Sequence, residues 1–312
     1  MSTLRWNELL QEWVIVTPRR AGRPFQDKER ACPFCPGQTE TKGDWKVLTL
    51  ENRFAALREE PGPVPLDTNI VMEAPAYGAS KVIVTSRNHD QQIEDMDKEQ
   101  LHRVFDEYRR VFKELDEKSD IHYVMEFENR GRAIGVSLNH PHAQVYALPF
   151  VPPRIRREIG AFQRLWNEAN TCLICQNVEN ELKSGNRIVH ETEQFVSLVP
   201  FAARLPYEVH IYPKWHVDSL SSMSDEIIDL GLMVKDTVQR YSKVFEENAY
   251  VMALHTRPSV GKHPYWHFHI EFYPPWRDRE RIKYLAGIET GAWTYTNDSQ
   301  PEEKAKELRE AL

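Results

Sequence analysis

An internal repeat constrains the fold of this chain more than any other feature of its sequence. Three segments of the first half recur in the same order in the second half. The matched segments are "CPFC" (32–35) with "CLIC" (172–175), "KVIVTSRNHD" (81–90) with "EVHIYPKWHVD" (208–218), and "NHPHAQVYALPF" (139–150) with "WHFHIEFYPPW" (266–276). Such a recurrence indicates that one structural unit is present twice.

The spacing between landmarks is the same in both halves. His89 and His140 are 51 residues apart, and His216 and His267 are also 51 residues apart. The chain has 312 residues, which suits two domains of ~100–200 residues each. We therefore expect two homologous modules, residues 1–150 and 151–312, which join near the proline-rich "PFVPP".

Each module combines strands with helices that do not alternate regularly. Runs rich in β-branched residues predict strands, and apolar residues at a spacing near 3.6 predict helices. The expected strands include 81–86, 121–128 and 196–200, and the expected helices are 98–115, 225–245 and 301–312. This order favours an α+β fold, two histidine-triad-like modules with largely antiparallel sheets and packed helices, over a parallel doubly wound sheet.

The composition excludes several classes of function. A formal net charge of −7 argues against a broad nucleic-acid or anionic-membrane surface. No run of about 18 apolar residues predicts a membrane span, and the start of the chain has no apolar core of a signal peptide. All four cysteines stand in C-x-x-C pairs, which in a cytoplasmic chain indicate metal binding or redox chemistry rather than disulfides. We expect a cytoplasmic location.

Each cysteine pair has two histidines at matching positions, and thiolates with imidazoles are ligands that suit Zn²⁺. The first expected site is Cys32, Cys35, His89 and His140, and the second is Cys172, Cys175, His216 and His267. A redox C-x-x-C or a pair of unliganded thiols is the alternative. For the second site a different set, Glu158, His255, His267 and His269, also remains open, with Fe²⁺ as the alternative ion. Four protein ligands leave no place for a reacting water, so we expect one or two structural ions.

The segment "HPHAQ" (140–144) contains a second histidine that zinc does not need. Residues two apart in a strand share a face, so His140, His142 and Gln144 should lie together. A neutral imidazole can attack phosphorus and form a phosphoramidate, which makes His142 a candidate nucleophile. Gln144 could donate a hydrogen bond to a phosphoryl oxygen. The second module has Glu271 at the position of Gln144, and a carboxylate would repel phosphate, so we expect that module to be catalytically silent.

Several longer segments resemble the galactose-1-phosphate uridylyltransferases of the histidine triad superfamily. They are "EWVIVTPRRAGRPFQ" (12–26), "CPFCPGQTE" (32–40), "ENRFAAL" (51–57), "FENRGRAIGVSLNHPHAQVYALPFVP" (127–152), "HFHIEFYPPW" (267–276) and "KYLAGIE" (283–289). The resemblance implies a homodimer that moves UMP from UDP-glucose to a hexose 1-phosphate, typically galactose 1-phosphate. It also implies a uridylyl-histidine intermediate and no organic cofactor.

The resemblance also implies roles for individual residues. His142 would be the nucleophile, with Gln144, Ser137 and Gly135 around the transferring phosphoryl group. The nucleotide end would be bound by Arg20, Arg23, Asn52 and Asn129. Lys283 and Glu289 would reach the sugar phosphate and the hexose hydroxyls from the partner subunit. At Ile288 and Tyr295 the chain differs from well-known bacterial members, so the resemblance leaves the hexose open.

Two other functions compete with this one. A sister branch with two C-x-x-C pairs includes phosphorylases that act on ADP-glucose and pass the nucleotide to inorganic phosphate. A zinc-binding interaction protein without catalysis is the third possibility, but it would need neither Gln144 nor the G-x-S that precedes the histidines. We expect a uridylyltransferase, with the phosphorylase as the alternative.

Overall fold

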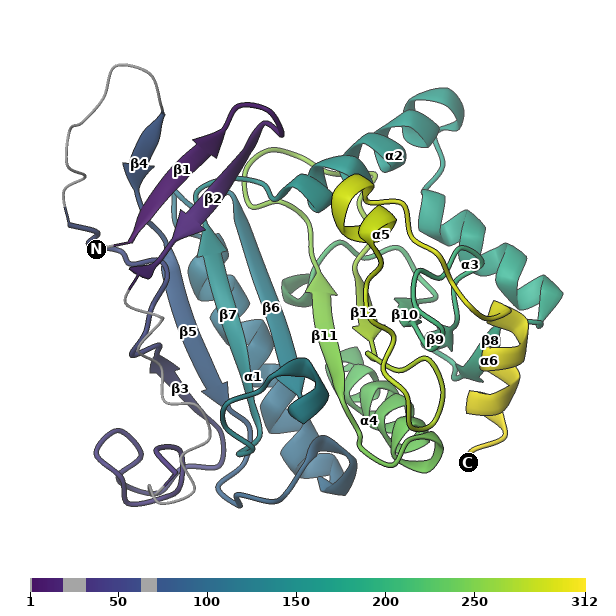
Figure 1. The fold of residues 1–312 in the computed structure, drawn as a ribbon, viewed down its shortest axis with the longest axis horizontal. Helices are drawn as coiled ribbons and strands as arrows, with labels where there is room; N and C mark the ends of the chain where they lie inside the picture. The colour runs from purple at the N-terminus through teal and green to yellow at the C-terminus, as the bar shows by residue number, and fades with distance from the viewer. Residues whose placement is uncertain (1, 19–31, 63–71) are drawn as a thin grey trace.

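The computed structural model describes residues 2–18, 32–62 and 72–312 (Figure 1). The strands in this part of the chain are β1 (Thr3–Asn7), β2 (Glu12–Val16), β3 (Leu48–Glu51), β4 (Glu73–Pro75), β5 (Ala79–Val84), β6 (Tyr123–Arg130), β7 (His142–Leu148), β8 (Ile188–Glu191), β9 (Phe195–Leu198), β10 (Val209–Pro213), β11 (Tyr250–His255) and β12 (His269–Tyr273). The α-helices are α1 (Lys98–Asp116), α2 (Pro153–Ala169), α3 (Leu173–Ser184), α4 (Glu226–Val244), α5 (Gly287–Ala292) and α6 (Pro301–Arg309).

A nine-stranded sheet, in which all neighbouring strands are antiparallel, forms the centre of the molecule. Its order is β3-β5-β7-β6-β11-β12-β10-β9-β8. From the junction of β6 and β11, the order β6-β7-β5-β3 on one side mirrors β11-β12-β10-β9 on the other. Helix α1 lies between β5 and β6 in the chain, as α4 lies between β10 and β11. The predicted α+β fold of two homologous modules is confirmed, and the two modules share one sheet.

The predicted elements agree with those observed to within a few residues. The strands expected at 81–86, 121–128 and 196–200 correspond to β5, β6 and β9, and the three expected helices correspond to α1, α4 and α6. A second sheet of three strands, β2-β1-β4, was not predicted. None of the helices in the described ranges is long and apolar enough to cross a membrane.

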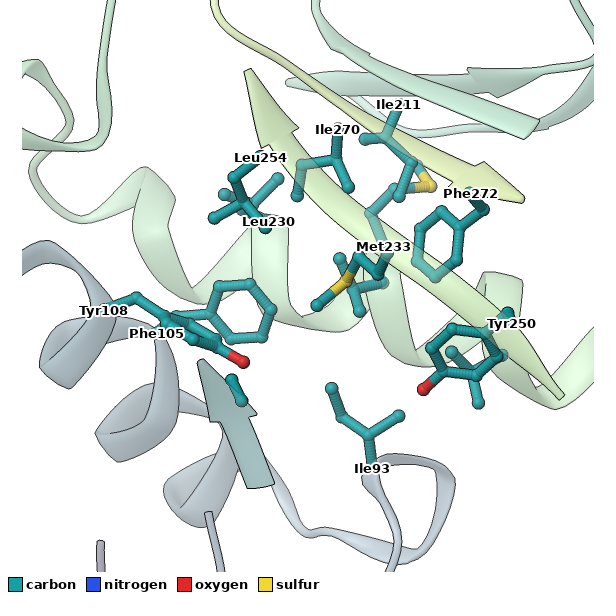
Figure 2. Packing of buried hydrophobic residues seen from close by; sticks show 14 of the residues in the cluster. Ile93, Phe105, Tyr108, Ile211, Leu230, Met233, Tyr250, Leu254, Ile270 and Phe272 are labelled. Carbon is teal, nitrogen blue, oxygen red and sulfur yellow. The ribbon is translucent and has the colours of Figure 1, made fainter. Parts of the chain in front are cut away.

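Helices α1 and α4 pack together against one face of the sheet, where the main hydrophobic core lies. Figure 2 shows Phe105 and Tyr108 of α1 in the same cluster as Leu230 and Met233 of α4. Gly231 permits this close contact, because a Cβ at its position would lie 2.9 Å from Cδ2 of Phe105. The helices therefore cover one face, and the opposite face of the central strands remains for the candidate site.

Gly78 sits at the entrance to β5, where the backbone approaches the neighbouring strand closely. Its φ is +134°, and a Cβ there would lie 2.2 Å from the carbonyl oxygen of Ala147. Gly78→Ala is therefore expected to lower the free energy of unfolding by roughly 1–3 kcal/mol, measured by urea denaturation. Gly160→Ala is the matched control: Gly160 lies inside α2 with open space around it, so alanine should raise stability by about 0.5–1 kcal/mol. Equal stability of Gly78→Ala and wild type would contradict the close approach.

Candidate functional site

His142 opens strand β7, and Gln144 follows it on the same face. Ala143 and Val145 alternate with these two residues along the strand and are fully buried against the helices, whereas His142 and Gln144 are half-buried. His140 precedes the strand rather than belonging to it, so the expectation of three side chains on one strand was wrong in that detail. Its ring nevertheless lies on the same side, because the Phe34 ring is 6.1 Å from that of His140 and 5.1 Å from that of His142.

The backbone fixes the tautomer of His142. Its Nδ1 lies 2.7 Å from the carbonyl oxygen of His140. A carbonyl oxygen only accepts hydrogen bonds, so Nδ1 must carry the proton. In the neutral ring the lone pair is then on Nε2, the nitrogen that a nucleophilic histidine would use.

A pocket lies beside His142, between the end of β6 and the start of β7. It is lined by Gln92, Glu128, Asn129, Arg130, Gly131, Val136, Leu138, Asn139, His140, Pro141 and His142. Asn129 and His142 thus line one pocket, and Gly135 and Ser137 belong to the loop, residues 131–141, that supplies six of the lining residues. Within the described residues neither Ser137 nor Gln144 has a side-chain hydrogen bond, so both are available to a ligand. These are the donors that a phosphoryl group would need.

The first cysteine–histidine set comes together beside this pocket. The ligand atoms of Cys32, Cys35, His89 and His140 all lie within 4.8 Å of one another. Cys35 Sγ is 3.5 Å from Nδ1 of His89 and 3.7 Å from Nδ1 of His140. A tetrahedral zinc ion with bonds of about 2.0–2.3 Å would hold its ligand atoms about 3.3–3.8 Å apart, so the set fits zinc.

The surroundings of His140 orient it as a metal ligand. Its Nε2 donates to the carbonyl oxygen of Ser86 at 2.8 Å, which leaves the lone pair on Nδ1, the nitrogen that faces Cys35. Burial lowers the pKa of His140 and so favours the neutral, metal-binding form. The turn that contains Cys32 and Cys35 is stabilised by Thr41, whose hydroxyl donates to the Cys35 carbonyl oxygen at 2.6 Å.

The second set repeats this arrangement in the other half. The ligand atoms of Cys172, Cys175, His216 and His267 again lie within 4.8 Å of one another. Nδ1 of His267 is 3.4 Å from both sulfur atoms, and its Nε2 donates to the carbonyl oxygen of Pro213 at 3.1 Å. Hydrogen bonding from Cys175, with further bonds from His216 and His267, lowers the pKa of the Cys172 thiol, and the thiolate is the metal-binding form.

A third cluster contains Glu158, His255, His269 and Glu271. The alternative metal set drawn from the sequence included His267, but His267 faces the cysteines and Glu271 takes the fourth position. The two sets therefore do not compete for one histidine.

An arginine already contacts both carboxylates of the third cluster. Arg154 pairs with Glu271, and its Nε lies 3.1 Å from Glu158. His255 bridges the same carboxylates, 3.0 Å from Glu158 and 3.3 Å from Glu271. A divalent cation would have to share this small space with a guanidinium group, so the residues present fit an internal ion-pair network better than a metal site.

His269 is the counterpart of His142, and its environment differs. Its Nδ1 also bonds to the carbonyl oxygen two residues earlier, at 3.0 Å from His267. However, His269 is only 3% exposed, and its Nε2 lies 3.6 Å from Glu271 and 4.0 Å from Glu158. Two carboxylates occupy the position that a phosphoryl group would need, which supports the expectation of a silent second module.

The remaining predicted residues lie elsewhere. Arg20 and Arg23 fall outside the described residues. Asn52 is half-buried at the end of β3, where its side-chain oxygen accepts from the backbone N–H of Phe54 at 2.9 Å. Lys283 Nζ lies 3.0 Å from the buried carboxylate of Glu289, and in Figure 1 α5, which contains Glu289, lies at the end of the sheet away from the start of β7.

Comparison with known proteins identifies the family. The sequence models of the N-terminal and C-terminal domains of galactose-1-phosphate uridyl transferase match residues 1–152 and 158–312. The chain belongs to this family. A galactose-1-phosphate uridylyltransferase of Thermotoga maritima is 38% identical over 99% of this chain and 98% of its own length. The family resemblance predicted from the sequence is confirmed.

Two solved structures share the fold over almost the whole chain. One described as a uridylyltransferase has a TM-score of 0.91 at 35% identity and covers 100% of this chain and 98% of its own. The ADP-glucose phosphorylase from Arabidopsis thaliana with bound ADP-glucose has a TM-score of 0.78 at 28% identity, with 99% of each chain covered. The phosphorylase is thus the more distant of these two relatives.

Proposed function

We propose that this protein transfers UMP from UDP-glucose to a hexose 1-phosphate, typically galactose 1-phosphate, through a uridylyl-histidine intermediate. The observation that carries the proposal is the fixed tautomer of His142 at the edge of the pocket, with Nδ1 bonded to the His140 carbonyl oxygen. Membership of the uridyl transferase family and 38% identity to a galactose-1-phosphate uridylyltransferase agree with it.

In the first half-reaction, Nε2 of His142 attacks the α-phosphorus of UDP-glucose. A P–N bond forms, the bond from the α-phosphorus to the bridging oxygen breaks, and glucose 1-phosphate leaves. The ring becomes positively charged, because Nδ1 keeps its proton while Nε2 gains a bond. The His140 carbonyl oxygen, 2.7 Å from Nδ1, accepts a hydrogen bond that strengthens as this charge develops.

In the second half-reaction, a phosphate oxygen of the hexose 1-phosphate attacks the same phosphorus. The P–N bond breaks, UDP-hexose leaves, and His142 returns to its neutral form. Gln144 and the hydroxyl of Ser137 donate to the phosphoryl oxygens in both steps, and the backbone at Gly135 lets the loop approach them. Asn129, Asn52, Arg20 and Arg23 bind the nucleotide in this proposal.

Lys283 and Glu289 act on the hexose phosphate only if a second copy of the chain supplies them. Within one chain they pair with each other at 3.0 Å, in a segment far along the sheet from the start of β7. The same segment exposes Tyr284, Leu285 and Ile288, which are 77%, 54% and 50% exposed. We therefore propose a homodimer in which this segment of each copy completes the site of the other.

Both cysteine–histidine sets would hold Zn²⁺ as a structural ion. Their soft thiolate ligands and oriented histidines favour zinc over Fe²⁺, and each set supplies all four ligands. Zinc at the first set would fix His140 and, through its carbonyl oxygen, His142. Reduced thiols that bind metal suit the cytoplasm, where we place the protein.

The proposal is tested by the intact mass of the protein after incubation with UDP-glucose or ADP-glucose. A UMP adduct that galactose 1-phosphate discharges as UDP-galactose is the expected result. An AMP adduct that inorganic phosphate discharges would instead assign the protein to the phosphorylase reaction that its relative from Arabidopsis thaliana is named for. No adduct with either nucleotide sugar would overturn the proposed mechanism.

A further inference from the structure

The loop that joins β6 and β7 is held by the other half of the chain. This loop, residues 131–141, contains Gly135 and Ser137 and lines the pocket beside His142. Its first turn is a short 3-10 helix, Arg132–Ile134. Residues of the connection between α4 and β11, which belongs to the second module, contact this turn and the glycine before it.

Glu247 in that connection accepts two backbone hydrogen bonds from the loop. Its Oε1 receives the N–H of Arg132 and, at 3.3 Å, the N–H of Ala133. Both amides lie in the first turn of the 3-10 helix, where no carbonyl oxygen of the helix itself can reach them. Because the acceptor is a carboxylate, these bonds are stronger than bonds between neutral groups.

The backbone on either side of this contact leaves the loop little freedom. Gly131 has a φ of +87°, and a Cβ at its position would lie 2.4 Å from Cβ of Ala249 and 2.8 Å from its Cα. Any side chain would therefore push the loop away from the second module. The strand pairing agrees with this close approach, because Arg130 at the end of β6 lies opposite Tyr250 at the start of β11.

The side chains next to Glu247 extend the same contact. Arg130 forms two hydrogen bonds to Glu94, at 2.5 and 2.7 Å, and Asn248 donates to Glu94 at 3.4 Å. The hydroxyl of Tyr250 donates to Glu128 at 2.8 Å. Each residue from Glu247 to Tyr250 thus touches, directly or through Glu94, the point where the chain leaves β6.

We propose that Glu247 is a positioning residue for nucleotidyl transfer: its carboxylate, supplied by the silent module, holds the loop that contains Gly135 and Ser137 at the distance His142 requires. This inference rests on the proposed function. It gives the second module a part in catalysis even though its own histidine, His269, is enclosed by carboxylates. The loop donors must meet a phosphoryl group whose place is set by His142, and a shift of about 1 Å in such a contact can slow a reaction about 100-fold.

The test is the single-turnover rate of UMP adduct formation, with wild type, Glu247→Ala and Glu247→Gln compared over a range of UDP-glucose concentrations. Alanine removes the acceptor, so the rate at saturating UDP-glucose should fall about 10- to 100-fold, with zinc content and melting temperature close to wild type. The rate at saturating UDP-glucose should change by a larger factor than the apparent affinity for UDP-glucose. Glutamine keeps an oxygen that can accept both bonds, so it should restore most of the rate.

Glu246→Ala is the matched control. Glu246 is the neighbouring glutamate, it is exposed, and within the described residues it makes no hydrogen bond or ion pair, so its removal should leave the rate unchanged. An unchanged rate in Glu247→Ala would overturn the inference alone. If Glu247→Ala does not fold, Glu247→Gln decides the test. A folded glutamine variant that forms no measurable adduct would also overturn the inference. A wild-type protein that forms no adduct would overturn the proposed function and this inference with it.

Discussion

His142→Asn is expected to abolish UMP transfer. Asparagine cannot form the P–N bond, and loss of an essential nucleophile lowers turnover by about 10⁴- to 10⁶-fold. No adduct should be found by mass after incubation with UDP-glucose, and no UDP-galactose should form when galactose 1-phosphate is added. Zinc content should equal that of wild type, because His142 lies outside both cysteine–histidine sets.

The matched control is His269→Asn, at the corresponding position of the second module. His269 is 3% exposed and enclosed by Glu158 and Glu271, so this change should lower stability while the folded protein still forms the adduct. Adduct formation by His142→Asn at the wild-type rate would refute the assignment of the nucleophile. Loss of the adduct in both variants would point to a shared structural role rather than to chemistry at His142.

The sequence alone predicts the fold class because the repeat is visible in residue types with strong chemical meaning. Each half has a C-x-x-C pair followed by two histidines that are 51 residues apart, and this recurrence identifies two copies of one module. What it could not predict is that β6 and β11 pair, so that one sheet crosses both modules. This pairing joins residues more than 100 positions apart, and no local pattern specifies such a contact.

The candidate site, like the fold, could be predicted from the sequence only in part. The sequence names Asn129 and His142, which line one pocket, and it names both zinc-type sets. The sequence also suggests an alternative metal set that contains His267, whereas in the structure Glu271 takes the place of His267 in that cluster. The ring of His267 instead faces Cys172 and Cys175 because its Nε2 bonds to a backbone carbonyl oxygen, and sequence does not show where such oxygens lie.

Contacts made by residues that belong to no recognisable catalytic motif were missed altogether. The Phe34 ring packs against the rings of His140 and His142, yet in the sequence Phe34 is only the third residue of a C-x-x-C pair. Glu247 lies in a run of charged residues, and nothing in the sequence separates it from Glu246. Arg154 contacts Glu271 and also Glu158, which the sequence suggested as a metal ligand. In each case the partner is distant in the chain, so only the folded structure identifies the contact.

Cys32→Ser is expected to lose one zinc ion per chain and to lower both stability and activity. Wild type should hold two ions, and serine is a poor ligand for zinc, so the variant should hold one. At a zinc concentration 1,000-fold above the dissociation constant, a bound ion stabilises the folded state by about 4 kcal/mol, and this stabilisation is lost. Elemental mass spectrometry measures the loss of zinc, and urea denaturation measures the loss of stability.

Activity should fall in Cys32→Ser because the metal acts on His142 through the backbone. Zinc would hold Nδ1 of His140, and the carbonyl oxygen of His140 fixes the proton on Nδ1 of His142 at 2.7 Å. Cys172→Ser is the matched control: it should lose the other ion and a similar stability, yet form the adduct at nearly the wild-type rate when folded. Full zinc content in Cys32→Ser would remove Cys32 from the metal site. An equal loss of rate in both variants would mean that zinc supports the fold as a whole and does not act on the nucleophile through His140.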